Sequence, residues 1–311
     1  MNKFLQVTII VSSVLFGSVA NGQVYNYEDG EGPTPPDSVK GLYVGINLGV
    51  YFANKQTARI YGGYGYLRDG EIIKSFSNSW LNQAIQGTPQ AEDRTSFAMD
   101  AAPGEWIFNE SDMPGLMTYR GSFMFGGHLR YMINSDFGFF TEVNGTFPVT
   151  VGEFTIQRVA PSPDPSQNQR LERFQIRGEE QRLMVNLGIH KVLGRKAAEA
   201  KGKAPTILPY FDLGGSVTFV KFEANFINLG DFQGGVVDLT NFFTNQGQFV
   251  ESANLLTGTG LGGFGSLGAQ ITLGRKFTID FGYVANLQQI RLGELNDIGL
   301  QHQIVLRAIY M

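Results

Sequence analysis

The stretch GLYVGINLGVYF, residues 41–52, alternates in character along its whole length. Its apolar residues occupy every second position and comprise Leu42, Val44, Ile46, Leu48, Val50 and Phe52. The residues between them are mostly Gly, Asn and Tyr. Because successive side chains of a β-strand point to opposite faces, this period of two predicts a strand with one apolar face and one face of small or polar residues.

The same alternation recurs down the chain, with connections of two kinds between the runs. Further strands are predicted at 119–133, 137–149, 181–193, 209–221, 260–273, 277–288 and 298–311. The longer connections are 53–118, 150–180, 222–259 and 289–297, and the shorter ones are 134–136, 194–208 and 274–276. Short turns on one side and long loops on the other are typical of outer-membrane barrels, with the termini on the periplasmic side. We therefore predict an all-β fold, an eight-stranded antiparallel up-and-down transmembrane β-barrel over 41–311 with long extracellular loops.

The composition fits such strands and excludes several classes of site. The 311 residues include 40 Gly and 25 Phe, and only 17% are charged. The absence of cysteine excludes disulfides, thiol catalysis, thiolate metal sites and a lipoprotein anchor. A net charge of −4 without a basic stripe indicates no nucleic-acid partner, and no cofactor is predicted.

The N-terminus has the three parts of a secretory signal. Lys3 precedes a mostly apolar run over 4–20, and Ala20-Asn21-Gly22 offers the small residues that a signal peptidase reads. We predict a signal peptide at 1–22, and the alternative is a short membrane anchor. Residues 23–40 are acidic and rich in Pro and Gly, which predicts a flexible lead-in to the barrel.

A soluble β-sandwich or a lipocalin-like barrel would also alternate. The polar face of these strands carries mainly Gly, Ser, Asn, Thr and Gln, and Lys is nearly absent from it. Water-facing strands usually carry more Lys and Glu, whereas a narrow barrel interior admits only modest side chains. Phe and Tyr also recur near the strand ends, as they do in the aromatic girdles of membrane barrels. The pattern therefore favours a barrel in a membrane.

The signal peptide, the eight strands, the loop rhythm and the C-terminal strand Leu300 to Met311 resemble the small OmpA/OmpX-type outer-membrane barrels of Gram-negative bacteria. The resemblance covers 41–311. Such barrels commonly end on an aromatic residue, whereas here Tyr310 stands one residue before the end. The resemblance implies a cell outer membrane location, contact with outer-membrane lipid and lipopolysaccharide, and other outer-membrane or periplasmic proteins as partners. We expect no periplasmic domain after the barrel.

The face assigned to the lumen carries charged residues, which must pair inside so narrow a barrel. They are Arg120, Arg130, Glu142, Arg182, Asp212, Asp280 and Arg307, together with His128 and His190. Arg130 and Glu142 lie on adjacent strands near the 134–136 turn and are predicted to form one buried pair. The interpretation we favour is an ion network that plugs the lumen, and the alternative is a gated pore.

The connection 53–118 is unusually long and aromatic. Its candidate interaction residues are Trp80, Trp106, Tyr61, Tyr64 and Tyr66. A loop of this length either binds a partner through these side chains or folds on itself as a cap over the barrel mouth, and the sequence leaves both open. Alternating apolar residues at Phe154, Ile156, Phe174 and Ile176 predict that the strands on either side of 150–180 continue as a hairpin above the membrane.

No catalytic motif is present in the sequence. The three histidines have no cysteine partner and no His-Glu-x-x-His pattern, so neither an enzyme nor a metal site is predicted. The leading hypothesis is a structural or interaction protein, or an accessory subunit of an outer-membrane complex. The alternative is a narrow channel for small solutes or ions, and a lipid hydrolase or acyltransferase at the barrel rim ranks last.

Overall fold

The computed structural model describes residues 40–63, 67–68, 71–72, 75–159, 170–195, 207–239, 257–273, 277–292 and 295–310. The predicted signal peptide and nearly all of the lead-in 23–40 lie outside the described residues, so that division of the chain stays a prediction. Tyr64 and Tyr66 also lie outside them. Among the described residues, no helix is long and apolar enough to cross a membrane.

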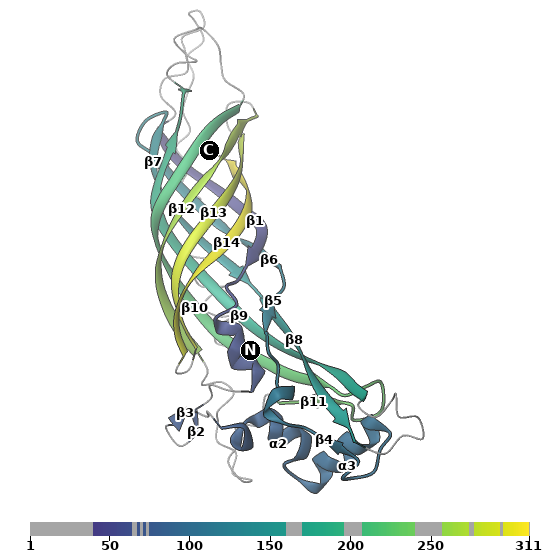
Figure 1. The fold of residues 1–311 in the computed structure, drawn as a ribbon. Coiled ribbons are helices and arrows are strands. Elements are labelled where there is room, and N and C mark those ends of the chain that lie inside the picture. Colours follow the sequence, from purple (N-terminus) through teal and green to yellow (C-terminus); the bar gives the residue numbers. More distant parts are fainter. Residues whose placement is uncertain are drawn as a thin grey trace, which may run out of the picture.

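Eight strands close into a ring of hydrogen-bonded neighbours (Figure 1). In order around the ring they are β1 (Gly41–Phe52), β6 (Ser122–Met132), β7 (Phe137–Thr146), β9 (Arg170–Val192), β10 (Ile207–Asn228), β12 (Thr257–Thr272), β13 (Phe277–Leu292) and β14 (Leu295–Tyr310). Every pairing is antiparallel, and β14 closes the ring because Tyr310 pairs with Val44 of β1 as well as with Phe277 of β13. The predicted eight-stranded antiparallel barrel is confirmed.

The wall of the ring is apolar outside and polar inside. Leu187 is 68% exposed on its outer face, while His190 of the same strand is buried inside. We call the outward set the apolar belt, and its members include Ile46, Val50, Phe125, Tyr131, Phe139, Leu187, Leu213, Leu267, Phe281 and Leu306. This burial is the reverse of the usual arrangement in soluble proteins.

Two strands, β9 and β10, continue beyond the ring, and the same sheet continues with them. β7 ends at Thr146, and after Pro148 the strand β8 (Val149–Arg158) takes over its place beside β9. β9 and β10 stay paired as far as Gln175 and Asn228. Short strands β4 (Trp106–Ile107) and β5 (Thr118–Tyr119) pair with β8, and β11 (Val236–Asp238) pairs with β10. We call this continuation of the sheet the extension, and the pairing of β8 with β9 confirms the predicted hairpin.

Figure 1 shows the extension leaving the ring at the end opposite the C-terminus, with helices gathered on it. The helices belong to residues 53–118, which we call the docked segment. Its elements are η1 (Thr57–Gly62), β2 (Leu67–Arg68), β3 (Glu71–Ile72), η2 (Phe76–Asn78), α2 (Trp80–Gln86), α3 (Pro89–Met99) and η3 (Glu110–Asp112), besides β4 and β5 at its end.

The two α-helices of the docked segment have clear start signals. The side chain of Ser79 accepts a hydrogen bond from the backbone N–H of Asn82 at the start of α2. Thr88 does the same for the N–H of Ala91 at the start of α3, where Pro89 occupies the first turn. Side-chain oxygens at these positions satisfy N–H groups that have no partner within the helix, so both helices begin where the sequence offers a cap.

Two predicted boundaries are wrong. The connection 289–297 is not a long loop, because β13 continues to Leu292 and pairs there with Leu295 of β14. Polar side chains at Gln289 and Arg291, on the face that is apolar in the ring, hid this continuation, since the strand leaves the apolar belt at that point. The strand predicted at 119–133 begins only at Ser122, because Thr118 and Tyr119 pair with β8 instead.

Candidate functional site: the filled lumen and the extension

A network of ion pairs crosses the lumen. Arg307 of β14 lies with Nε 2.6 Å from Oε1 of Glu142 and with Nη1 3.0 Å from Oδ2 of Asp212. Arg130 of β6 lies 2.5 Å from Oδ2 of Asp280 on β13. All five side chains are almost fully buried. The network therefore joins strands on opposite sides of the ring, so it braces the barrel from within.

Both lumen histidines contact the same carboxylates. Nδ1 of His128 lies 2.9 Å from Glu142, and Nδ1 of His190 lies 2.7 Å from Asp212. Each carboxylate thus holds an imidazole as well as the Arg307 guanidinium. Buried charges cost several kcal/mol of desolvation each unless they are paired in this way.

The structure corrects two details of the predicted lumen set. Arg130 and Glu142 do not pair with each other, because Arg130 pairs with Asp280 across the lumen, while Glu142 is held by Arg307 across the lumen and by His128 on the neighbouring strand. Arg120 is exposed on the outside. Its backbone N–H bonds to the carbonyl of Val149, so it continues the line of β5 along β8 and never enters the ring.

A second polar cluster lies at the mouth of the ring, around the predicted lumen residue Arg182. Its guanidinium donates to Glu180 at 2.8 Å, to the hydroxyl of Tyr51 at 2.9 Å and to the hydroxyl of Thr57 at 3.2 Å. The hydroxyl of Tyr51 donates in turn to Gln301 at 3.0 Å. We call these residues, together with Tyr119, the mouth cluster. One buried guanidinium thereby ties the barrel wall to the first residues of the docked segment.

Tyr119 completes the mouth cluster from the side of the extension. Its hydroxyl donates to Glu180, and burial, together with the negative charge of Glu180, raises the pKa of Tyr119 well above its usual value. The phenol therefore stays protonated and serves as a donor. The sequence did not indicate Glu180, because the predicted strand began at residue 181. It did not single out Tyr51 or Tyr119 either, because an inward Tyr resembles any other lumen residue.

Apolar side chains fill more of the lumen. They are Tyr51, Met124, Phe140, Met184, Phe264, Val284 and Val305, and they form one buried cluster. Phe140 of this cluster lies against His128 of the ion network, and Tyr51 belongs to the mouth cluster as well. Side chains fill an eight-stranded interior in this manner when the barrel serves as a solid support.

Three of the predicted interaction residues in the docked segment lie in a core and not on an outer surface. Tyr61, Trp80 and Trp106 are buried, so of the two alternatives left open by the sequence, the one in which these three bind a partner is wrong. The ring of Tyr61 stacks on Phe222 of β10 with centroids 5.2 Å apart. Gly178 of β9 makes this possible, because a Cβ at that position would overlap the Tyr61 ring.

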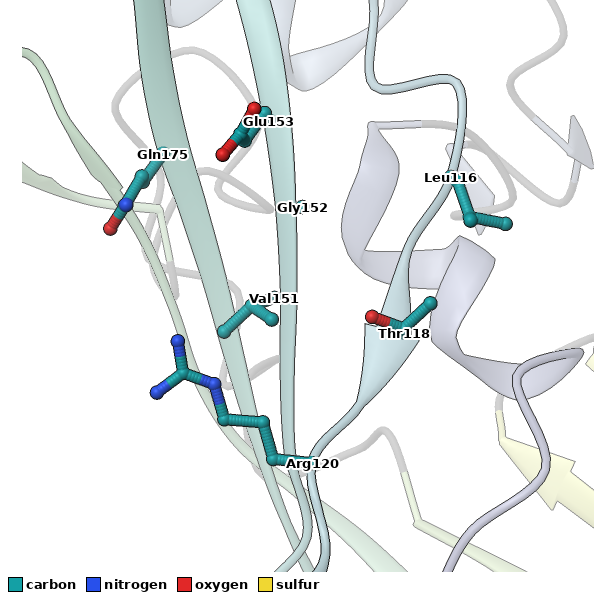
Figure 2. Close-up of a pocket in the computed structure, with 7 residues that line it drawn as sticks. All are labelled: Leu116, Thr118, Arg120, Val151, Gly152, Glu153 and Gln175. Carbon is teal, nitrogen blue, oxygen red and sulfur yellow. The ribbon is translucent and has the colours of Figure 1, made fainter.

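A shallow groove of about 400 Å³ lies on the outer face of the extension. Figure 2 shows its lining residues, which are Leu116, Thr118, Arg120, Val151, Gly152, Glu153 and Gln175. The charged groups Arg120 and Glu153 are both exposed to solvent. Exposed groups of this kind do not provide the converging acid, base and nucleophile that catalysis requires.

The lumen holds one arrangement with the side-chain types of a hydrolase. Ser266 donates to Oδ2 of Asp212 at 2.8 Å, and Oδ1 of the same carboxylate contacts His190. The carboxylate stands between the hydroxyl and the imidazole, so His190 cannot take the Ser266 proton directly. Among the described residues, no group of three His, Asp or Glu side chains could hold a metal ion.

No family model and no curated protein matches the chain. Its fold is similar to solved structures of small outer-membrane barrels. Neisserial surface protein A has a TM-score of 0.40 and 9% identity over 87% of this chain and 96% of its own. Ail of Yersinia pestis has a TM-score of 0.30 and 14% identity over 88% and 99%, and OprG of Pseudomonas aeruginosa has a TM-score of 0.34 and 11% identity over 87% and 93%. At these values the likeness adds nothing about binding or activity.

Proposed function

We propose that this chain is a non-enzymatic barrel of the outer membrane that anchors the extension at the cell surface and presents it to partner proteins. A reversal of polarity along one strand carries the proposal. In the ring half of β9, Leu187 faces outward and His190 inward. In the extension half, Arg177 faces outward and Ile176 inward. One half is thus suited to lipid and the other to water.

The ring supports a membrane location through its belt. Large apolar side chains are exposed on all eight strands, and they surround an interior of buried charges. A monomer in water rarely exposes so much continuous apolar surface. A closed ring also satisfies the backbone hydrogen bonds of every strand, as a hydrocarbon environment demands.

The extension supports an extracellular display role. It continues from the end of the ring that bears the long connections, opposite the end where Gly41, Met132 and Tyr310 lie. In outer-membrane barrels the long connections face outward from the cell. The aromatic core that contains Tyr61, Trp80 and Trp106 fixes the shape of the extension. A surface whose shape is fixed before binding loses less conformational entropy when a partner binds.

The filled lumen weighs against the channel hypothesis. The Arg307 network, the apolar cluster that includes Phe140 and Met184, and the mouth cluster fill the described interior with side chains. We expect planar-bilayer recordings of the purified protein to show no steps of conductance. Steady conductance steps would instead favour the narrow channel.

The proposal is tested by membrane fractionation combined with gel electrophoresis with and without heating. A folded barrel resists SDS until it is boiled, so we expect the protein in the outer-membrane fraction with a band that shifts on heating. A soluble periplasmic protein without a heat shift would overturn the proposal. Purification in mild detergent then addresses partners, and a lone monomer without partners would contradict the role in a complex.

A further inference from the structure

Two phenylalanines meet at the far end of the extension. Phe97 lies on α3, and Phe232 lies in the connection between β10 and β11. Their ring centroids are 4.8 Å apart with a tilted geometry. Phe97 is 68% exposed, whereas Phe232 is half-buried against the core of the extension. The pair is therefore anchored to the core through Phe232 and exposed to solvent through Phe97. We call it the aromatic tip.

The aromatic tip lies far from the apolar belt, so lipid does not account for its exposure. β4 and β11 pair with the last residues of β8 and β10, and Arg158 at the end of β8 donates to the carbonyl of Met99 at the end of α3. Val236, on β11, adds a further apolar side chain that is 62% exposed. Exposed aromatic side chains on a rigid support are common at protein–protein interfaces.

Three aspartates lie close to the two phenylalanines along the chain. Asp93 lies four residues before Phe97, which places it beside Phe97 on the surface of α3. Asp100 follows the end of α3 as its C-cap residue. Asp231 directly precedes Phe232. All three aspartates are exposed.

Two arginines close to these aspartates, Arg94 beside Asp93 in the sequence and Arg158 at the backbone of Asp100, donate to backbone carbonyls. Arg94 donates to the carbonyl of Ala84 at 2.7 Å, and Arg158 donates to the carbonyl of Asp100 at 2.7 Å. Neither guanidinium forms an ion pair with Asp93 or Asp231 among the described residues. The surface thus combines two aromatic rings with a local excess of negative charge.

We infer that the aromatic tip and its three aspartates form a docking site for a basic segment of a partner protein, in which Lys or Arg side chains stand next to apolar ones. Cations bind to the faces of aromatic rings, and carboxylates beside the rings attract and orient them. Apolar neighbours of those cations would cover Phe97 and Val236. This inference rests on the proposed function, because it names the kind of partner protein to which the extension binds.

The test uses the full chain in nanodiscs of zwitterionic lipid, with empty nanodiscs as the blank. The probe is a synthetic peptide of alternating Lys and Leu, and its counterpart alternates Glu and Leu. We expect the Lys peptide to bind and the Glu peptide not to bind. The double variant F97S/F232S should lose about tenfold in affinity for the Lys peptide.

Two further variants separate the contributions of charge and ring. D93K/D231K should weaken binding and flatten its dependence on salt, because screened attraction between charges is then lost. Leu116→Ser is the matched control, since Leu116 is 60% exposed elsewhere on the extension. We expect its affinity to equal that of the wild type.

Equal binding of the two peptides, or wild-type affinity in F97S/F232S, would overturn the inference. The heat shift of the same samples on gels shows whether the barrel is folded and inserted, so this outcome leaves the proposed function standing. A chain that does not insert would overturn the proposed function and the inference together.

Discussion

The ring half and the extension half of β9 belong to one uninterrupted strand, yet they bury opposite kinds of side chain. Near the C-terminal end of the strand, Leu187 faces outward while Asn186 and His190 are buried. Near its start, Phe174 and Ile176 are buried while Arg177 is exposed. The backbone ladder with β10 is continuous apart from one irregularity beyond Phe222. One continuous strand therefore exposes apolar side chains in its ring half and charged ones in its extension half, as a strand that passes from lipid into water is expected to do.

The interiors of the two halves are stabilised in different ways. The ring is too narrow for a separate core element, so charged side chains that reach across it pair with one another. The extension is open on its inner face, and the docked segment supplies an aromatic core to cover it. Substitutions should therefore have effects that depend on the half in which they fall.

The largest effect is expected from Arg307→Met. This change leaves Glu142 and Asp212 buried without their shared guanidinium, and breaking a buried pair costs about 3–5 kcal/mol. The urea concentration at which the heat-modifiable band is lost should fall strongly. Arg177→Met is the control, because Arg177 is exposed on the extension. An unchanged midpoint in Arg307→Met would mean that water, and not this ion network, fills the lumen.

The second-largest effect is expected when two leucines that point outward from the same strand are each replaced by Arg. Leu187→Arg places a charge in the apolar belt and should cost about 2–4 kcal/mol, reducing the amount of assembled barrel. Leu171→Arg makes the same change on the extension, where Leu171 is 57% exposed to water, and assembly should be normal. Quantifying the heat-shifted band in the outer-membrane fraction measures both. Equal assembly of the two variants would refute the assignment of different media to the two halves.

A smaller effect is expected at the contact between the docked segment and the sheet. Gly178→Ala adds a Cβ that overlaps the Tyr61 ring, and overpacking of this kind costs about 1–3 kcal/mol. Limited proteolysis should cleave within 53–118 faster, while the heat shift of the barrel stays intact. Gly215→Ala, where a Cβ meets only ordinary contacts, should leave the cleavage rate unchanged. Wild-type cleavage in Gly178→Ala would show that the segment is not held by this contact.

The smallest effect is expected at Arg120. Its side chain is exposed on the groove and is no part of the lumen network, so Arg120→Ser should change stability by less than about 0.5 kcal/mol. Urea titration of the heat-modifiable band measures this. A loss of stability as large as that of Arg307→Met would contradict the placement of Arg120 outside the lumen.

The alternation in the sequence predicts the ring well, because each ring strand carries large apolar residues at alternate positions of its outward face. It fails where β9 passes into the extension. There the apolar residues move from even positions, such as Phe174 and Ile176, to odd ones, such as Leu183 and Leu187. The pleat itself does not change, so a prediction based on one apolar face ends at this crossover.

Most of the charged residues of the lumen could be predicted from the sequence, but the ion-pair partner of each could not. An inward Arg or Asp can be assigned from the period of a strand, but its partner depends on which strands stand opposite across the lumen. Arg130 and Asp280 lie on β6 and β13, which are not neighbours in the sheet. The burial of Trp80 and Trp106 was equally hidden, because aromatic composition is the same in a docked segment and in an exposed loop.

Cysteine labelling on intact cells tests the difference between the two halves most directly, because the chain contains no cysteine of its own. Gln175→Cys and Leu187→Cys place single thiols on the outward face of β9, one in each half. A membrane-impermeant maleimide should label Gln175→Cys on intact cells, and should label Leu187→Cys only after the protein is denatured. Equal labelling of both thiols on intact cells would contradict the account.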